Sequence, residues 1–251
     1  MRRNIVTGSA SGMGAAVREL LRAQGEEVVG IDRHDADIVA DLGSAEGRAA
    51  AVTAAAARMP QGFDALILCA GLASSDGRAV VAVNFFGVVE LIHSLRPLLR
   101  RGRGARVVAI SSSAMILPFD ETIVMPCLAG DEEAALAAAE NNPLAYASSK
   151  AALSRWIRRT SVAPGWADCG ILLNGVAPGL VNTPMIAPLL ATAEGRERLA
   201  SSAPYATPHA AEASDIAPLI AFLASAHNRY MVGQVPFCDG GKDVLLRGET
   251  P

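Results

Sequence analysis

Short apolar runs alternate along the chain with longer segments in which apolar residues recur at every third or fourth position. The apolar runs predict strands at 5–6, 28–31, 38–40, 65–69, 107–110, 171–174 and 235–238. The periodic segments predict helices at 15–24, 44–58, 80–100, 146–160 and 214–225. Because the strands are continuously apolar and separated by helices, we expect a parallel sheet covered by helices on both faces.

This order of elements predicts an α/β fold, a single-domain Rossmann-type doubly wound parallel sheet of about seven strands. No repeat or low-complexity linker divides residues 1–251, and that length suits one domain with a continuous core.

Composition and charge narrow the classes of function. The formal net charge is −3, so the chain has no basic surplus for a phosphate backbone, and we expect no nucleic-acid partner. The four cysteines lack disulfide-like spacing and the four histidines form no paired-ligand pattern, so we expect free thiols and no protein-held metal. No run approaches the roughly 20 apolar residues of a membrane span, which favours a cytoplasmic protein without a membrane partner.

Lysine is scarce. Among the 22 basic residues only Lys150 and Lys242 are lysines, and codon usage that favours arginine explains the scarcity. Lys242 follows Asp239-Gly240-Gly241, and we expect it to be solvated near the C-terminus.

A glycine-rich segment follows the first predicted strand and opens the first helix. Its glycines let the backbone turn tightly and approach a pyrophosphate at the positive end of the helix. The residues expected to form this loop are Gly8, Ser11, Gly12, Met13 and Gly14.

Asp32 ends the second strand, about 20 residues beyond the loop, where a carboxylate accepts hydrogen bonds from an adenosine ribose. Since that carboxylate would repel a 2′-phosphate, we expect NAD rather than NADP. Arg33 leaves the alternative open, because its side chain could turn toward a phosphate.

Tyr146 and Lys150 are four residues apart and therefore share one face of a helix. With three tyrosines and two lysines in the chain, such a pair is expected by chance about 0.02 times. A nearby ammonium stabilises tyrosinate, and a tyrosine pKa near 10 must fall by roughly three units for proton transfer near neutral pH. An incidental pair on an amphipathic surface is the alternative.

The chain resembles the short-chain dehydrogenase/reductase family in five motifs, which lie at 7–14, 83–87, 110–112, 146–150 and 174–179. The resemblance implies that Tyr146 is the general acid/base and that Lys150 lowers its pKa and holds a ribose. It implies that Ser112 holds the substrate oxygen, with Ser111 and Ser113 as competitors, and that Asn84 positions a water in a proton relay. A hydride then passes between the nicotinamide of NAD and a secondary alcohol or ketone.

The cofactor contacts expected on this basis extend from the glycine loop to Thr183. They are Gly8, Ser11, Gly12, Met13, Gly14, Asp32, Asp41, Leu42, Ala70, Gly71, Tyr146, Lys150, Pro178, Gly179, Val181 and Thr183.

Three departures from the common family pattern stand out. Cys69 occupies the place of an asparagine that usually braces the sheet, and Asp32 to Asp41 leaves too little chain for the usual helix. An extra segment at about 119–143 contains a predicted acid-capped helix. These departures look most like the bacterial 3α-hydroxysteroid dehydrogenase/carbonyl reductase branch of the family.

The substrate side is predicted more coarsely. Apolar residues between 183 and 211 suit a lid over a hydrophobic substrate, although a stripe packed on the sheet or on a subunit explains them equally well. We expect a neutral, bulky apolar alcohol or ketone held by Ser112, Tyr146, Met115 and Met185. Because the insert precedes the Tyr146 helix, where the family commonly has a subunit interface, we expect a homodimer rather than a tetramer.

Other functions fit these motifs less well. A noncatalytic dinucleotide-sensing regulator of the same fold would usually lose Tyr146 or Lys150, and a scaffold would not need Ser112 with them. A sugar-nucleotide epimerase shares the Tyr/Lys chemistry but usually has a longer chain with a distinct substrate domain.

Overall fold

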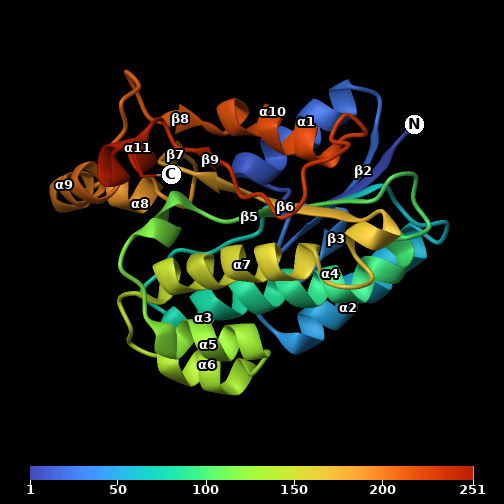
Figure 1. Ribbon diagram of the computed structural model, residues 1–251, viewed down its shortest axis with the longest axis horizontal. Helices are drawn as coiled ribbons and strands as arrows, with labels where there is room; N and C mark the ends of the chain where they lie inside the picture. Colours follow the sequence, from blue (N-terminus) through green and yellow to red (C-terminus); the bar gives the residue numbers. More distant parts are fainter. Residues whose placement is uncertain (251) are drawn as a thin grey trace.

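The computed structural model describes residues 1–250 as a parallel sheet between two layers of helices (Figure 1). The sheet has seven strands in the order β3-β2-β1-β4-β5-β6-β9, and every pairing is parallel. The strands are β1 (Arg3–Thr7), β2 (Glu27–Asp32), β3 (Ile38–Val39), β4 (Ala65–Leu68), β5 (Arg106–Ile110), β6 (Leu172–Pro178) and β9 (Phe237–Cys238). The predicted doubly wound α/β fold is confirmed.

Alternate strand residues face two separate cores. Ile5 belongs to the core shared with α2 (Ala45–Arg58), α4 (Gly87–Leu99) and α7 (Ala145–Ser161). The next residue, Val6, belongs to the core on the opposite face of the sheet. That face is covered by α1 (Gly12–Ala23) and α10 (Ala213–Ala224), which pack against each other. Because helices cover both faces of the central strands, the apolar runs within them, such as 5–6 and 107–110, do not alternate with polar residues.

One long helical stretch, 77–99, combines α3 (Gly77–Val81), a π-helical turn (Ala82–Phe86) and α4. By length and hydropathy this stretch could span a membrane, whereas we predicted no such segment. Most of its apolar window, 61%, is buried inside the protein, where it packs against the sheet and α7. Its apolar character therefore has a structural cause within the fold.

The insert forms two helices rather than the one that we predicted. Helix α5 (Glu121–Ala129) begins after an Asp120 cap and ends at Gly130, which has a left-handed conformation. Helix α6 (Glu132–Ala139) begins after the predicted acidic cap, Asp131, whose carboxylate accepts a hydrogen bond from the Ala134 amide. Both helices lie outside α3 and α7, at the lower edge of Figure 1.

The C-terminal part carries the remaining short elements. Strands β7 (Val181–Asn182) and β8 (Ala211–Glu212) pair with each other. Helices α8 (Ala187–Leu190) and α9 (Ala193–Ser202) lie between these two strands in the sequence. Helix α11 (Lys242–Arg247) packs against the 3-10 turn Ser113–Ile116. The expectation that Lys242 is solvated is wrong, because its side chain is only 2% exposed where α11 begins.

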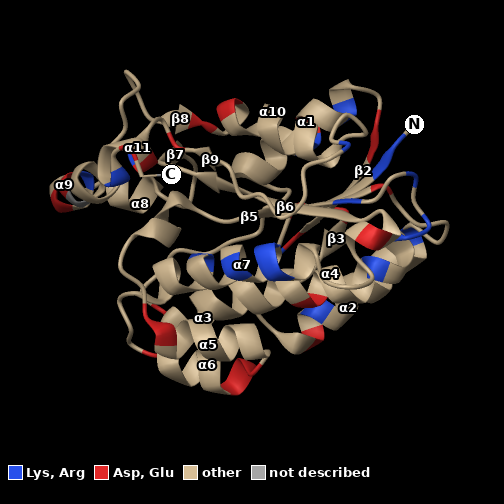
Figure 2. Cartoon of the chain, in the orientation of Figure 1, with Lys and Arg blue, Asp and Glu red and all other residues tan. Residues whose placement is uncertain are grey.

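Arginine side chains at the amino-terminal edge of the sheet mostly donate hydrogen bonds to backbone carbonyls. Arg2 donates to the carbonyls of Asp64 and Ala224, Arg3 to that of Gln61, and Arg101 to that of Pro60. Figure 2 shows this basic edge around the N-terminus, away from α8 and α9. These arginines satisfy loop carbonyls at the edge opposite the predicted site.

Candidate active site

The glycine loop joins the carboxyl end of β1 to α1 and lies against the end of β4. Gly8 and Gly12 have φ angles of +67° and +52°, which favour glycine. A Cβ on Gly14 would lie 2.0 Å from the Gly8 carbonyl oxygen, and one on Gly8 would lie 2.7 Å from the Ala70 nitrogen. The tight packing leaves no room for side chains at these positions.

The first turn of α1 offers a place for an anion. Ser11 caps the helix without a side-chain hydrogen bond, and the turn contains no acidic residue. The amide groups at this positive helix end therefore suit a pyrophosphate.

Asp32 lies at the edge of a cavity that the glycine loop also lines. One carboxylate oxygen accepts a hydrogen bond from the Ala10 amide at 2.9 Å, and the other accepts one from the Arg33 amide at 2.6 Å. Arg33 and His34 line the cavity beside Asp32. The carboxylate thus lies where the adenosine ribose of a dinucleotide is expected.

The structure brings most of the expected cofactor contacts to one cavity. From the predicted set this cavity, which we call the dinucleotide cavity, is lined by Gly8, Ser11, Gly12, Met13, Gly14, Asp32, Asp41, Leu42, Ala70, Gly71 and Thr183. Met185, an expected substrate contact, lines it too. The lining residues that were not among the predicted cofactor contacts are Arg33, His34, Ala40, Cys69, Leu72, Val83 and Pro184. The sequence offered one signal for these residues, which is that each lies within a few positions of a predicted site residue.

Five expected cofactor contacts do not line the cavity: Tyr146 and Lys150 of α7, and Pro178, Gly179 and Val181 at and after the end of β6. Pro178 ends β6 and is buried, and a Cβ on its neighbour Gly179 would lie 2.7 Å from the Asp239 Cα. The Val181 side chain is 6% exposed and belongs to the core beneath α10, so only its backbone is available to a cofactor. Thr183 reaches the glycine loop, with its methyl group 3.2 Å from where a Gly12 Cβ would lie.

Tyr146 lies in the first turn of α7 and faces the end of β5. Burial raises the pKa of Tyr146, and a hydrogen bond with Ser112 acts in the opposite direction. Protein groups alone therefore do not produce the lowered pKa that the Tyr/Lys spacing led us to expect. Ser112 itself caps the following 3-10 turn, where its hydroxyl accepts a hydrogen bond from the Ala114 amide at 3.1 Å.

Lys150 lies one turn further along α7 and is 4% exposed. Its ammonium nitrogen donates to the Ile110 carbonyl at 2.9 Å and lies 5.9 Å from the centre of the Tyr146 ring. Burial lowers the pKa of Lys150 to about 8. Burial also raises the pKa of the nearby Cys69 to about 12, so that thiol stays neutral near pH 7.

Asn84 lies in the π-helical turn, a feature that often marks functional sites. Its side chain is fully buried, accepting from the Leu72 amide at 2.8 Å and donating to the Leu72 carbonyl at 2.9 Å. The amide also donates to the Ser149 hydroxyl at 3.2 Å. Asn84 thus links the turn after β4 to α7, and both Asn84 and Lys150 lie beside Gly71.

The neighbours of Ser112 have different surroundings. The Ser111 hydroxyl lies 2.7 Å from that of Ser154 and donates to the Lys150 carbonyl, so it faces α7. Ser113 is 2% exposed. The Met115 sulfur accepts a hydrogen bond from Ser154 at 2.9 Å, so this expected substrate contact points toward α7 rather than into the dinucleotide cavity.

A second cavity lies between the end of the lid segment, the start of α10 and the turn after β9. It is lined by Leu180, Tyr205, Thr207, His209, Ala210, Ala211, Asp215, Ile216, Phe237, Cys238, Asp239, Gly240 and Gly241. None of the expected catalytic side chains lines it. Within residues 1–250, no three His, Cys, Asp or Glu side chains gather closely enough to hold a metal ion.

Comparisons with known proteins agree with this geometry. Residues 3–124 match the family described as short chain dehydrogenase, and residues 132–243 match the family described as Enoyl-(Acyl carrier protein) reductase. The chain is 38% identical to the 3-alpha-hydroxysteroid dehydrogenase/carbonyl reductase of Comamonas testosteroni, over 97% of each chain. The chain belongs to the short-chain dehydrogenase/reductase family.

Other members of the family are similar over nearly the full length. A coniferyl-alcohol dehydrogenase of Pseudomonas sp. is 30% identical, over 94% of each chain. The crystal structure of the 3-alpha-hydroxysteroid dehydrogenase from Pseudomonas sp. B-0831, complexed with NADH, has a TM-score of 0.92 at 40% identity. That match covers 99% of this chain and 100% of that one. This short-chain dehydrogenase/reductase is therefore an oxidoreductase.

Proposed function

We propose that the protein uses NAD to interconvert a bulky apolar secondary alcohol and its ketone, such as a hydroxysteroid or an alicyclic or aromatic carbonyl compound. The observation that carries the proposal is the convergence of Ser112, Tyr146 and Lys150 at the end of β5, beside the dinucleotide cavity. The fit of the glycine loop to a pyrophosphate supports the cofactor class. When bound, the nicotinamide supplies the hydride acceptor or donor.

The protein's own residues then have separate tasks. Ser112 holds the substrate oxygen, and the Tyr146 hydroxyl takes or gives the proton of that oxygen. Lys150 binds the nicotinamide ribose and stabilises tyrosinate by its charge. Asn84 holds the turn after β4 and, together with Lys150, orders a water that connects the tyrosine to solvent.

NAD is the proposed cofactor because of Asp32. Its carboxylate is held by two backbone amides, so it remains fixed where a 2′-phosphate would approach. The alternative, NADP, depends on Arg33, whose charge would have to offset that of Asp32.

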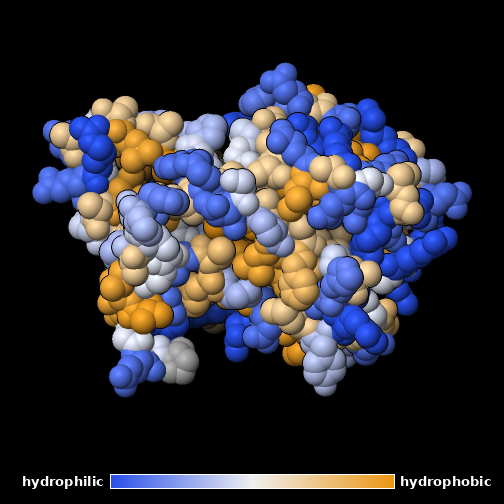
Figure 3. Space-filling view, turned by 90° about the horizontal axis from the view of Figure 1, so that it is seen from above, coloured by the Kyte–Doolittle hydropathy of each residue, from blue (hydrophilic) through white to orange (hydrophobic). Residues whose placement is uncertain are grey.

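An apolar substrate is supported by the surface beside the catalytic residues. Met185, Leu189, Val244, Leu245 and Leu246 are all more than one third exposed. Apolar side chains gather at the end of the molecule formed by α8, α9 and α11 (Figure 3). The segment 183–211 acts as a lid in this proposal, and the names of the relatives refer to steroid and aromatic alcohols.

The test is a spectrophotometric screen of alcohols and ketones with NAD(H) and NADP(H) in parallel. We expect turnover of alicyclic or aromatic substrates with NAD(H). Turnover of short polar alcohols alone would contradict the substrate class, and a preference for NADP(H) would contradict the cofactor.

We also propose a homodimer built on α10 and β9. Helix α5 packs along α7 and covers the face through which the family commonly forms a further interface. The remaining candidate surface includes Phe222, an aromatic side chain 43% exposed on α10. Light scattering that gave a tetramer or a monomer would contradict this assembly.

A further inference from the structure

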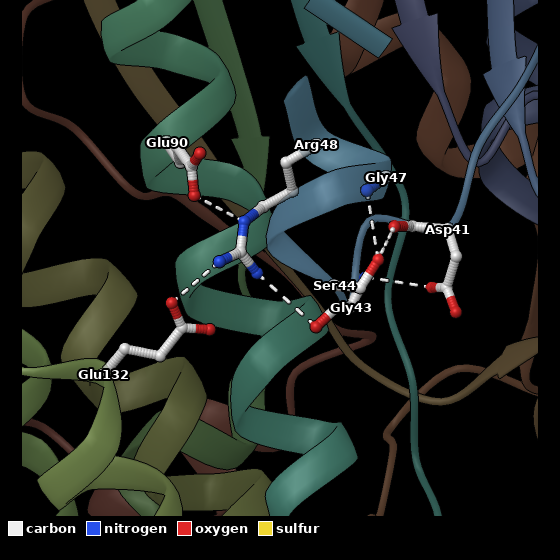
Figure 4. Close-up of polar contacts among 7 residues, drawn as sticks. All are labelled: Asp41, Gly43, Ser44, Gly47, Arg48, Glu90 and Glu132. Atoms are coloured by element: carbon white, nitrogen blue, oxygen red, sulfur yellow. Dashed lines mark hydrogen bonds and ion pairs between the residues drawn. The ribbon is translucent and has the colours of Figure 1, made fainter. Parts of the chain in front are cut away.

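A buried arginine connects the insert to the turn 41–43, which lies at the adenosine end of the dinucleotide cavity because the preceding Ala40 amide donates to the Asp32 carbonyl at 2.8 Å. Arg48 lies in the first turn of α2 and is 1% exposed. Its guanidinium pairs with Glu90 of α4 and, at 2.7 Å, with Glu132 of α6. A third nitrogen donates to the Gly43 carbonyl at 3.4 Å (Figure 4).

The turn that receives this third contact contains two of the expected cofactor residues. Asp41 and Leu42 line the dinucleotide cavity, and the Asp41 carboxylate accepts a hydrogen bond from the Gly43 amide at 2.9 Å. Ser44 then caps α2 through the Gly47 amide at 3.1 Å (Figure 4).

Two helices grip this turn closely. A Cβ on Gly47 of α2 would lie 2.0 Å from the Asp41 carbonyl oxygen, and a Cβ on Gly87 of α4 would lie 2.8 Å from that of Leu42. Glu90, the partner of Arg48, lies less than one turn beyond Gly87. Arg48 therefore fixes the separation of α2 and α4, the two helices between which the turn is held.

Because the charge of Arg48 is buried, this arrangement depends on all of its partners. A guanidinium without solvent needs its partners, and loss of one leaves an uncompensated charge that distorts its surroundings. Glu90 and Glu132 are 43% and 33% exposed, so water can solvate them if Arg48 is removed. The effect of removing Arg48 should therefore concentrate on the turn and on the seating of α6.

We propose that Arg48, held by Glu132 of the insert, is a positioning residue that sets the affinity for the adenosine half of the cofactor. The inference rests on the proposed dinucleotide binding. It gives the insert a task in cofactor binding, in addition to covering α7.

The experiment compares Arg48→Met, Glu132→Gln and Arg78→Met by titration calorimetry with NAD, ADP-ribose and nicotinamide mononucleotide. Arg78 is the matched control, since it pairs with Glu140 at the other end of α6, at 4.0 Å, and does not line the cavity. We expect Arg48→Met to weaken NAD and ADP-ribose about tenfold, the loss of roughly one hydrogen bond, and the mononucleotide less than about twofold. Glu132→Gln should show the same selectivity at about threefold, and Arg78→Met no change.

Two results would overturn the proposal. Unchanged ADP-ribose affinity in Arg48→Met shows that the turn does not depend on Arg48, and equal losses for both half-molecules show a merely structural role. If Arg48→Met does not fold, the selectivity of Glu132→Gln decides alone. A wild-type protein that binds neither NAD nor ADP-ribose would instead refute the proposed function itself.

Discussion

The Lys150 ammonium donates a hydrogen bond to the backbone carbonyl of Ile110, 2.9 Å away at the carboxyl end of β5. This contact holds the lysine beside Tyr146, the proposed general acid/base. It also keeps a charged group in a buried place, where burial lowers the pKa of Lys150 to about 8. Stability and the proposed function therefore conflict at Lys150.

We predict that Lys150→Met stabilises the ligand-free protein near pH 7 while abolishing turnover. The shift of the pKa from 10.5 to about 8 corresponds to about 3 kcal/mol. The unpaired Ile110 carbonyl costs about 1 kcal/mol, which leaves a net gain of about 2 kcal/mol. Urea unfolding at pH 7 measures the difference.

The same group predicts a pH dependence. Between pH 8 and 10.5 the unfolded state of the wild-type protein binds more protons at Lys150 than the folded state does, so this group makes stability rise with pH. The advantage of Lys150→Met should shrink over that range. Lys150→Arg, which stays charged, is the control and should show no such rise. An advantage that is constant with pH would contradict the lysine as its source.

We predict that Tyr146→Phe lowers kcat by at least about 10³-fold and leaves the Kd for NAD within about twofold, because only the proton-transferring hydroxyl is lost. Ser112→Ala should lower kcat by about 10²-fold, since it removes one hydrogen bond to the reacting oxygen. Ser113→Ala is the control at the neighbouring position and should retain activity. Stopped-flow and steady-state kinetics measure these effects, and full activity of Tyr146→Phe would refute its role.

We predict that Asp32→Ala changes the preference between cofactors. Loss of the carboxylate removes both the ribose acceptor and the repulsion of a 2′-phosphate, so kcat/KM for NAD should fall by about tenfold or more and that for NADP should rise. Asp32→Ala combined with Arg33→Ala separates the contribution of the arginine. If the single variant discriminates as strongly as the wild-type protein, Asp32 does not determine the preference.

We predict that Phe222→Arg dissociates the proposed dimer without unfolding the protein. The side chain lies on the exposed face of α10, so a charge is tolerated in the monomer but is costly inside an interface. Light scattering measures the mass, and circular dichroism checks the fold. Val162→Arg, at a 73% exposed residue after α7, is the control and should leave the mass unchanged.

The sequence predicted the sheet well because each of its central strands contains an uninterrupted apolar run, such as 5–6, 65–68 and 107–110. It predicted the glycine loop because the backbone requires Gly8, Gly12 and Gly14. Helix α5 was missed because it is apolar on all sides and contains Pro126, although Asp120 and Gly130 mark its ends. Contacts between residues far apart in the chain could not be predicted from the sequence.

One error of side-chain placement shows why. Lys242 follows a turn in which Gly240 and Gly241 have positive φ angles, and this turn starts α11 with the lysine buried. The direction of the Met115 side chain likewise depends on a distant residue, Ser154, 39 residues later. Arg48 carried no sequence signal, since its partners lie 42 and 84 residues away.

The pairing of β7 with β8 brings the two ends of the segment 183–210 together. A loop whose ends are already joined can change in length and composition at small entropic cost, and it leaves β6 and α10 in place. The pairing of β7 with β8 thus allows this segment to be replaced without disturbing the rest of the fold. Since this segment is the proposed substrate lid, we expect related enzymes to differ in the compounds they accept through changes in it, while the sheet and the glycine loop stay the same.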